Sequence, residues 1–134
     1  IFGLPDDDLE TMQATLDMAL DLNCEFANFY SAMAYPGSRL YEIALQEGWP
    51  LPEKWAGFSQ HSEDTLPLPT KFVSASEVLG FRDRVFEIYF TSPGYLDLLQ
   101  RKFGPETVRH VRDMTSHKLV RKYAGSLAGQ ASSP

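Results

Sequence analysis

The chain begins with an apolar run that leads directly into a helix, and this order limits the folds open to it. Residues 1–3 (IFG) have the character of a buried strand, and Leu4-Pro5 is typical of the turn that leaves a strand. An acidic cluster and an apolar stripe at helical spacing predict a helix with Asp7 as its N-cap and Asn23 as its terminator. Because the first residue already resembles a strand interior, we expect the chain to be a piece of a longer protein.

A second apolar run follows that helix. Residues 26–35 are aromatic and mostly apolar without strict alternation, which is typical of a strand buried on both faces of a parallel sheet. Ser38 then predicts the start of a second helix, and Gly48 its end. Residues 1–48 are therefore predicted to form a βαβα unit, the kind that builds parallel sheets and α/β barrels.

The rest of the chain has a different character. Residues 49–73 are rich in proline and aromatic residues and lack periodicity, so they are interpreted as a connecting loop that covers a site or separates two units. Residues 74–123 show only helical patterns, with a capping box at Ser74 and Glu77. Residues 124–134 are small and polar and are expected to be disordered. The predicted fold class is α/β to mainly α, a βαβα piece followed by a helical C-terminal extension.

Charge is distributed unevenly along the chain, whose formal net charge is −6. Residues 1–64 hold 12 acidic and 2 basic residues, a charge of −10, whereas residues 101–122 hold 7 basic and 2 acidic residues, a charge of +5. The basic stretch could contact nucleic acid, an acidic partner or the acidic half of its own chain. Nucleic acid is the least favoured of these, because no aromatic residues are interleaved with the charges.

The sequence offers neither a catalytic motif nor a metal-binding motif. His61, His110 and His117 lack the spacing of metal ligands, and the three aspartates at 6–8 are explained by the start of a helix. Cys24 is the only cysteine, which excludes an internal disulfide and any all-cysteine cluster site. No apolar run reaches the roughly 18 residues of a membrane-spanning helix, and a cytoplasmic location is expected.

A pair of strings carries the clearest relationship to known proteins: residues 1–11 (IFGLPDDDLET) and residues 29–41 (FYSAMAYPGSRLY). The first resembles the FIxGLPGET segment of radical S-adenosylmethionine enzymes, and the second resembles the next strand of that family and its PGT-x-L turn. Together they resemble the fifth and sixth strands of the family's partial (β/α)6 barrel. Residues 74–123 are similar, more loosely, to the helical C-terminal extension of the cobalamin-binding subgroup.

The chain departs from the family in two respects. Asp6 and Asp7 stand where the family has Gly-Glu, and Asp8 stands where it has Thr. The CxxxCxxC motif, whose thiolates hold the [4Fe–4S] cluster that binds S-adenosylmethionine, is absent. In the family that motif lies upstream of both strings. The resemblance therefore implies a C-terminal fragment that is inactive alone and whose partner is the rest of the parent chain.

The resemblance also implies a cofactor-binding edge. Its six residues are Gly3, Leu4, Pro5, Met33, Ala34 and Tyr35. The first three would approach the adenosine of S-adenosylmethionine, and the last three would line the adenine side, at the C-terminal ends of parallel strands. The parent would use S-adenosylmethionine and a [4Fe–4S] cluster, with cobalamin in the named subgroup, for reductive cleavage, hydrogen abstraction and methyl transfer.

A different class of function stays open at this point. The chain is also interpreted as a non-enzymatic helical module whose basic last helix contacts a protein or RNA. In either case two parallel strands without sheet neighbours would leave unpaired edges. The sequence therefore predicts pairing with a second copy, exchange of elements, or loss of strand form at Ile1. The substrate of the parent cannot be read from these residues.

Overall fold

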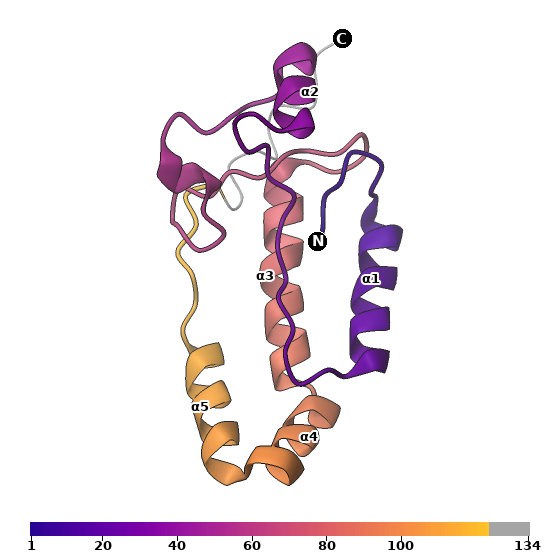
Figure 1. Ribbon diagram of the computed structural model, residues 1–134, viewed down its shortest axis with the longest axis vertical. Coiled ribbons are helices and arrows are strands. Elements are labelled where there is room, and N and C mark those ends of the chain that lie inside the picture. Colours follow the sequence, from indigo (N-terminus) through magenta and orange to yellow (C-terminus); the bar gives the residue numbers. More distant parts are fainter. Residues whose placement is uncertain (124–134) are drawn as a thin grey trace.

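The computed structural model describes residues 1–123, and in this range the chain is mainly helical (Figure 1). The elements are α1 (Leu9–Leu22), α2 (Arg39–Glu47), the short 3-10 helix η1 (Trp55–Phe58), α3 (Ala75–Thr91), α4 (Pro93–Phe103) and α5 (Pro105–Ser116). The expectation of a mainly α chain is confirmed. Residues 124–134, for which the sequence predicts a disordered tail, lie outside the described range.

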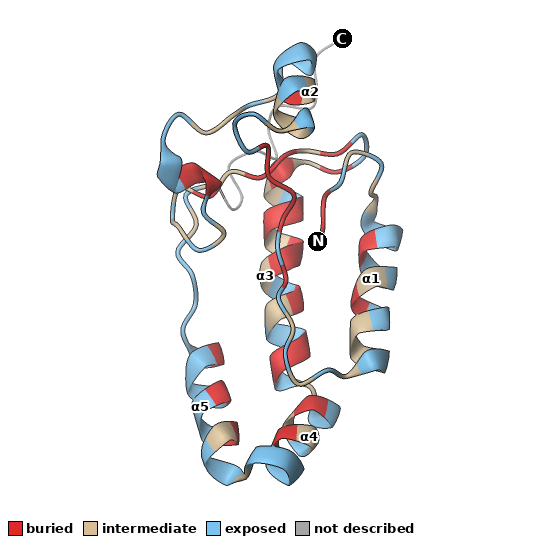
Figure 2. Ribbon diagram, in the orientation of Figure 1, coloured by how far each residue is buried: buried red, intermediate tan, exposed pale blue. Residues whose placement is uncertain are grey.

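Helix α3 is the centre of the fold. It contacts α1, α4 and α5, and residues 24–35 run along it as an extended segment (Figure 1). Buried residues occur along its whole length, as Figure 2 shows. The rings of Phe29 and Tyr89 meet edge to face with centroids 5.1 Å apart, and those of Phe2 and Phe81 do so at 5.3 Å. Each such pair contributes about 0.5–1.5 kcal/mol beyond the burial of its surface.

The two predicted strands are reduced to one bridge. Phe2 and Ser31 form an isolated parallel bridge, in which the amide of Phe2 donates to Tyr30 O at 2.9 Å and the amide of Ala32 donates to Phe2 O at 2.7 Å. Helix α1 connects its two sides, so the order of a βαβ unit is kept. The strands themselves are not observed in residues 1–123, because each side of the bridge lacks a full neighbouring strand. The partial barrel therefore stays a proposal.

Most helix ends lie where local residues predict them. Ser38 and Ser74 cap α2 and α3 with their side chains, and Glu77 completes the second capping box. Asn23 ends α1 in the left-handed conformation (φ 43°), and Gly48 ends α2 in the same region (φ 66°). These groups act within one turn of the chain, which is why the sequence alone predicts them.

Two helix boundaries differ from the prediction. The N-cap of α1 is Asp8, whose carboxylate accepts from the amide of Thr11 at 2.8 Å, and not Asp7. Helix α5 ends at Ser116, whereas the predicted helical region extends to residue 123, so Leu119 and Tyr123 lie in the irregular segment after the helix. That segment turns back along the molecule and is held by tertiary contacts, which helical periodicity does not report.

The proline-rich segment is ordered and crosses the end of the bridge. In residues 49–73, the amide of Leu68 donates to Ala32 O at 3.2 Å and that of Lys71 donates to Pro5 O at 3.0 Å. Leu68 also forms a second small core with Ala34 and Ala44. Residues 49–73 therefore lie across the C-terminal end of both bridged segments. The division of the chain at 48 and 73 stays a prediction.

Candidate functional site

The bridge brings the two halves of the predicted cofactor site to one end of the fold. Because Phe2 faces Ser31 in parallel, residues 3–5 and residues 33–35 both leave the bridge in the same direction. We call these six residues the parallel edge. Their proximity agrees with the geometry that the sequence predicts, whereas their role in binding a cofactor stays a prediction.

Gly3 explains why the chain can turn sharply at this edge. Its φ is +80°, and a Cβ atom there would lie 2.5 Å from Cγ1 of Val78 in α3. Only glycine combines this backbone angle with so close an approach. The amides of Gly3 and Leu4 both donate to Oδ2 of Asp7, at 3.0 Å each. Asp7, which the sequence predicts to be a helix cap, thus closes this turn instead.

The parallel edge is partly covered in this structure. Met33 and Ala34 have 5% and 3% of their surface exposed, and Pro5 accepts a hydrogen bond from Lys71. Tyr35 is half exposed, with its ring 6.2 Å from that of Phe58. Leu4 is 45% exposed, so the edge is covered at Met33 and Ala34 and open at Leu4 and Tyr35.

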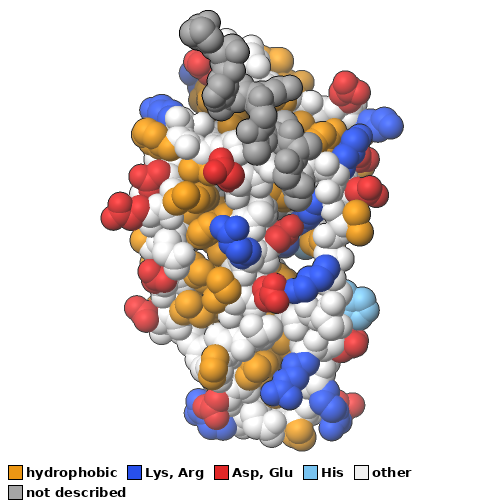
Figure 3. Space-filling model, turned by 180° about the vertical axis from the view of Figure 1, so that it is seen from behind, with side chains coloured by type: hydrophobic (Ala, Val, Ile, Leu, Met, Phe, Trp, Pro, Cys, Tyr) orange, Lys and Arg blue, Asp and Glu red, His pale blue; other side chains and the backbone are white. Residues whose placement is uncertain are grey.

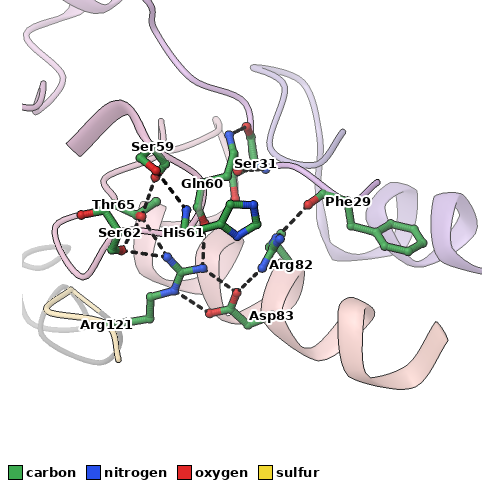
Figure 4. Close-up of polar contacts among 10 residues, drawn as sticks. All are labelled: Phe29, Ser31, Ser59, Gln60, His61, Ser62, Thr65, Arg82, Asp83 and Arg121. Atoms are coloured by element: carbon green, nitrogen blue, oxygen red, sulfur yellow. Dashed lines mark hydrogen bonds and ion pairs between the residues drawn. The ribbon is translucent and has the colours of Figure 1, made fainter. Parts of the chain in front are cut away.

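A second group of polar residues lies against α3, and the sequence does not predict it. The guanidinium of Arg121 binds the carboxylate of Asp83 through two hydrogen bonds, Nε to Oδ2 at 2.9 Å and Nη2 to Oδ1 at 2.8 Å (Figure 4). The guanidinium of Arg82 donates to the same Oδ1 at 2.9 Å and to Phe29 O at 2.8 Å. Both arginine side chains have 3% of their surface exposed. We call these three charged residues the arginine cluster.

The loop before α3 completes the arginine cluster. Arg121 also donates to Gln60 O at 3.0 Å, Ser62 O at 2.9 Å and Thr65 Oγ1 at 2.8 Å. Burial alone would raise the pKa of Asp83, but hydrogen bonds from Arg121 and then Arg82 outweigh it and hold that pKa below its ordinary value. The carboxylate is therefore ionised near neutral pH and joins α3 to the segment after α5.

His61 lies beside this cluster without a metal-like environment. Partial desolvation, followed by the charges of Arg82 and Arg121, lowers the pKa of its imidazole, against the opposite effect of Asp83. The ring is therefore neutral at pH 7 in a positive local potential. The described residues contain no group of three or more His, Cys, Asp or Glu able to hold a metal ion.

A cavity of about 460 Å³ opens next to the arginine cluster. Its walls come from α3, the end of α5, the segment after α5 and His61. The apolar part of the wall includes Phe86, Met114 and Leu119, while Arg84 and Lys118 add positive charge. A space of this size, mostly apolar with a few charged groups, has the general character of a small-molecule site.

The basic stretch of the sequence is largely neutralised by the chain itself. Of the 7 basic residues in 101–122, 5 form ion pairs with acidic side chains. The pairs are Arg101–Asp97, Lys102–Glu25, Lys118–Glu87, Arg121–Asp83 and Lys122–Asp64. Basic and acidic side chains accordingly lie side by side across the face seen in Figure 3. Two of these acids, Glu25 and Asp64, belong to the acidic residues 1–64, and the other three lie between residues 83 and 97. Contact with a partner molecule stays a prediction.

One signal in the sequence could have indicated the cluster. Arg82 lies beside Phe81 in the apolar stripe of α3, and an arginine at such a position needs a buried partner. Asp83 is its neighbour and an obvious acceptor. The other partner of Asp83, Arg121, is 38 residues away from it and carries no local signal.

No α-helix of residues 1–123 is long and apolar enough to cross a membrane.

Comparison with known proteins gives one partial similarity. The chain is 36% identical over 59 residues to an uncharacterized methyltransferase of Pyrococcus horikoshii. The match covers 44% of this chain but 13% of that protein, so the chain corresponds to a small part of its relative. No family model and no solved structure matches the chain. The similarity is compatible with a methyl-transfer enzyme as the parent.

Proposed function

We propose that this chain is the C-terminal portion of a radical S-adenosylmethionine enzyme that transfers methyl groups. The observation that carries the proposal is the parallel bridge between Phe2 and Ser31, with α1 as its connection. Neighbouring barrel strands would share a parallel pairing of this kind, so the bridge supports the proposal. The similarity to a methyltransferase supports the same class of parent.

The chain itself would contribute structure and part of a binding edge. With Cys24 as its only cysteine, it cannot supply the thiolates of a [4Fe–4S] cluster, and no step of the reaction is assigned to it. In the parent, S-adenosylmethionine bound to the cluster would supply the radical. The backbone at Gly3 and the side chain of Tyr35 would then face the nucleoside. Cobalamin would be held by parts of the parent outside residues 1–123.

The first test is to read the gene around this chain. The proposal expects a CxxxCxxC motif in the same reading frame, within roughly 200 codons upstream of Ile1, the scale of a barrel domain. The protein made from that frame under anaerobic conditions should convert S-adenosylmethionine to 5′-deoxyadenosine with a chemical reductant. A frame without the motif, or a protein that binds a cluster without this product, would refute the proposal.

A pair of tyrosine variants tests the role of the parallel edge in that parent. Tyr35→Ala should raise the KM for S-adenosylmethionine about five- to tenfold, because an aromatic contact with a base is lost. Tyr30→Ala is the matched control, since Tyr30 is also partly exposed (39%) but lies before the bridge. Equal effects of the two variants would remove Tyr35 from the site while leaving the assignment of the parent intact.

The alternative of a protein- or RNA-binding module is not supported by a specific observation. Its motivation was the basic stretch, and five of those seven charges have acidic partners within the chain. A cytoplasmic location and the pairing of two copies likewise stay predictions. Reconstitution of the isolated chain with iron and sulfide is expected to give no [4Fe–4S] absorption band, and such a band would contradict its assignment as an inactive portion.

A further inference from the structure

Two cavities lie between α3 and α5 and share Phe86 and Met114 in their walls. The first is the space beside the arginine cluster, which we call the charged cavity. The second, which we call the aromatic cavity, has a volume of about 440 Å³ and is bounded by residues 25–28, α3, α4 and α5. Because the same two side chains border both spaces, the cavities are neighbours, and we call the pair the groove.

The charged cavity carries an excess of positive charge. Asp83 is already bound by two arginines, and Glu87 forms an ion pair with Lys118 at 2.7 Å. Arg84 also lines the cavity, and its guanidinium lies over the ring of Phe81 at 5.7 Å without an ion pair among the described residues. The pKa of His61, on the same wall, is lowered first by desolvation and then by the charges of Arg82 and Arg121. An anion bound here could therefore pair with Arg84, which has no acidic partner among the described residues.

The aromatic cavity has the opposite character. Its walls are formed mainly by apolar side chains, among them Phe90, Tyr95, Leu99 and Val111. Phe26 and Phe103 also line it, with 89% and 50% of their surface exposed, so two large rings face water here. A hydrocarbon or ring inserted here would remove this apolar surface from water.

We propose that the groove binds a small amphipathic anion, with a carboxylate or phosphate head beside Arg84 and an alkyl body that extends past Met114 into the aromatic cavity. The complementarity of one cationic end and one apolar end to such a molecule carries the inference. Each cavity lies in the size range of small-molecule sites. The groove is separate from the parallel edge, and this proposal does not depend on the proposed function.

Met114 controls the passage between the two cavities. Its side chain lines both, and the residue is 37% exposed, so a flexible thioether can move aside at little cost. A ligand long enough to use both cavities should therefore bind more tightly than a short one with the same head. This dependence on length distinguishes the groove from a surface that only attracts anions.

The test uses the 134-residue chain and alkyl carboxylates below their micelle concentrations. Titration calorimetry and amide chemical shifts would compare decanoate, hexanoate and uncharged 1-decanol. Decanoate should bind at one site and shift amides of α3 and α5. Hexanoate and 1-decanol should each bind at least about tenfold more weakly, because each lacks one of the two contacts. Equal affinity of decanoate and 1-decanol, or of decanoate and hexanoate, would overturn the proposal.

Two variants locate the ligand. Arg84→Ala should weaken decanoate binding about five- to tenfold, whereas Arg109→Ala, an exposed arginine of α5 outside both cavities, should not. Met114→Trp should obstruct the passage and reduce the affinity for decanoate to that for hexanoate. If the tryptophan variant fails to fold, the comparison of Arg84→Ala with Arg109→Ala still tests the proposed site. Equal losses in both arginine variants would show general charge attraction and would refute the site.

Discussion

The carboxamide of Gln60 pairs with the main chain of Ser31 as a neighbouring strand would. The amide of Ser31 donates to Oε1 of Gln60 at 2.9 Å, and Nε2 of Gln60 donates to the carbonyl of Ser31 at 2.9 Å. Ser31 forms its bridge to Phe2 on the opposite side. One side chain thus satisfies an edge that would otherwise expose an unpaired donor and acceptor.

Removal of this carboxamide should open the edge. Gln60→Ala is expected to lower the free energy of unfolding by about 1–3 kcal/mol, because a donor and an acceptor lose their partners. The amide of Ser31 should also exchange its hydrogen faster, as measured by NMR. The control is Gln100→Ala, at an exposed position of α4. Unchanged protection of Ser31 in the Gln60 variant would show that its amide does not depend on this contact.

The segment after α5 should depend on one arginine. Arg121→Ala is expected to cost about 3 kcal/mol in urea denaturation, since it removes the two-bond partner of the Asp83 carboxylate and the arginine donor to Gln60 O. Arg112→Ala removes an exposed arginine of α5 and should change stability by less than about 0.5 kcal/mol. If the two variants lose the same stability, Arg121 does not anchor the segment.

Asp83 should make the fold sensitive to acid. Its pKa is lowered in the folded chain, so its contribution is complete above the unfolded value of about 3.9 and is lost as pH falls through the folded value. We expect the urea midpoint to decrease below about pH 4. Asp83→Asn should be less stable at pH 7 and show a shallower decrease on acidification. The exposed Asp97→Asn variant serves as the control, and a slope unchanged by Asp83→Asn would contradict the assignment.

Two glycines should respond in opposite directions to the same substitution. Gly3→Ala is expected to lose at least about 2 kcal/mol, because the residue has φ +80° and its new Cβ would meet Val78 at 2.5 Å. Gly80→Ala, inside α3 with open space around it, should gain about 0.4–1 kcal/mol. Thermal or urea unfolding of both variants measures the difference. A neutral Gly3 variant would mean that the turn can relax away from α3.

Sequence reasoning succeeded where a signal and its effect lie within one helical turn. Ser74 and Glu77 predict the start of α3, and Gly48 predicts the end of α2. It failed by one residue at α1, where Asp7 and Asp8 are chemically equal candidates. The turn at Gly3 recruits the first carboxylate, which leaves Asp8 as the cap. That choice depends on the path of the chain before the helix, which periodicity does not contain.

The predicted strands show the same limit. The apolar run at residues 26–35 was interpreted as a strand from its composition, and a strand exists only when a neighbour supplies its hydrogen bonds. In this structure the main chain of Phe2 supplies the hydrogen bonds on one side of the run, to Tyr30 and Ala32. The side chain of Gln60 supplies those on the other side, to Ser31. The extended conformation was predictable, but the identity of the partners was not.

The sequence by itself determined most of the helix caps and the parallel relation of the two segments that resemble a family, and it predicted a chain between α/β and mainly α. Only the tertiary structure decided that Gln60 would close the edge 29 residues away and that Arg121 would bind Asp83 38 residues away. The physical reason is the range of the interactions. Caps and stripes act between residues that are close in the chain, whereas buried polar groups take whichever partner the fold brings within hydrogen-bonding distance.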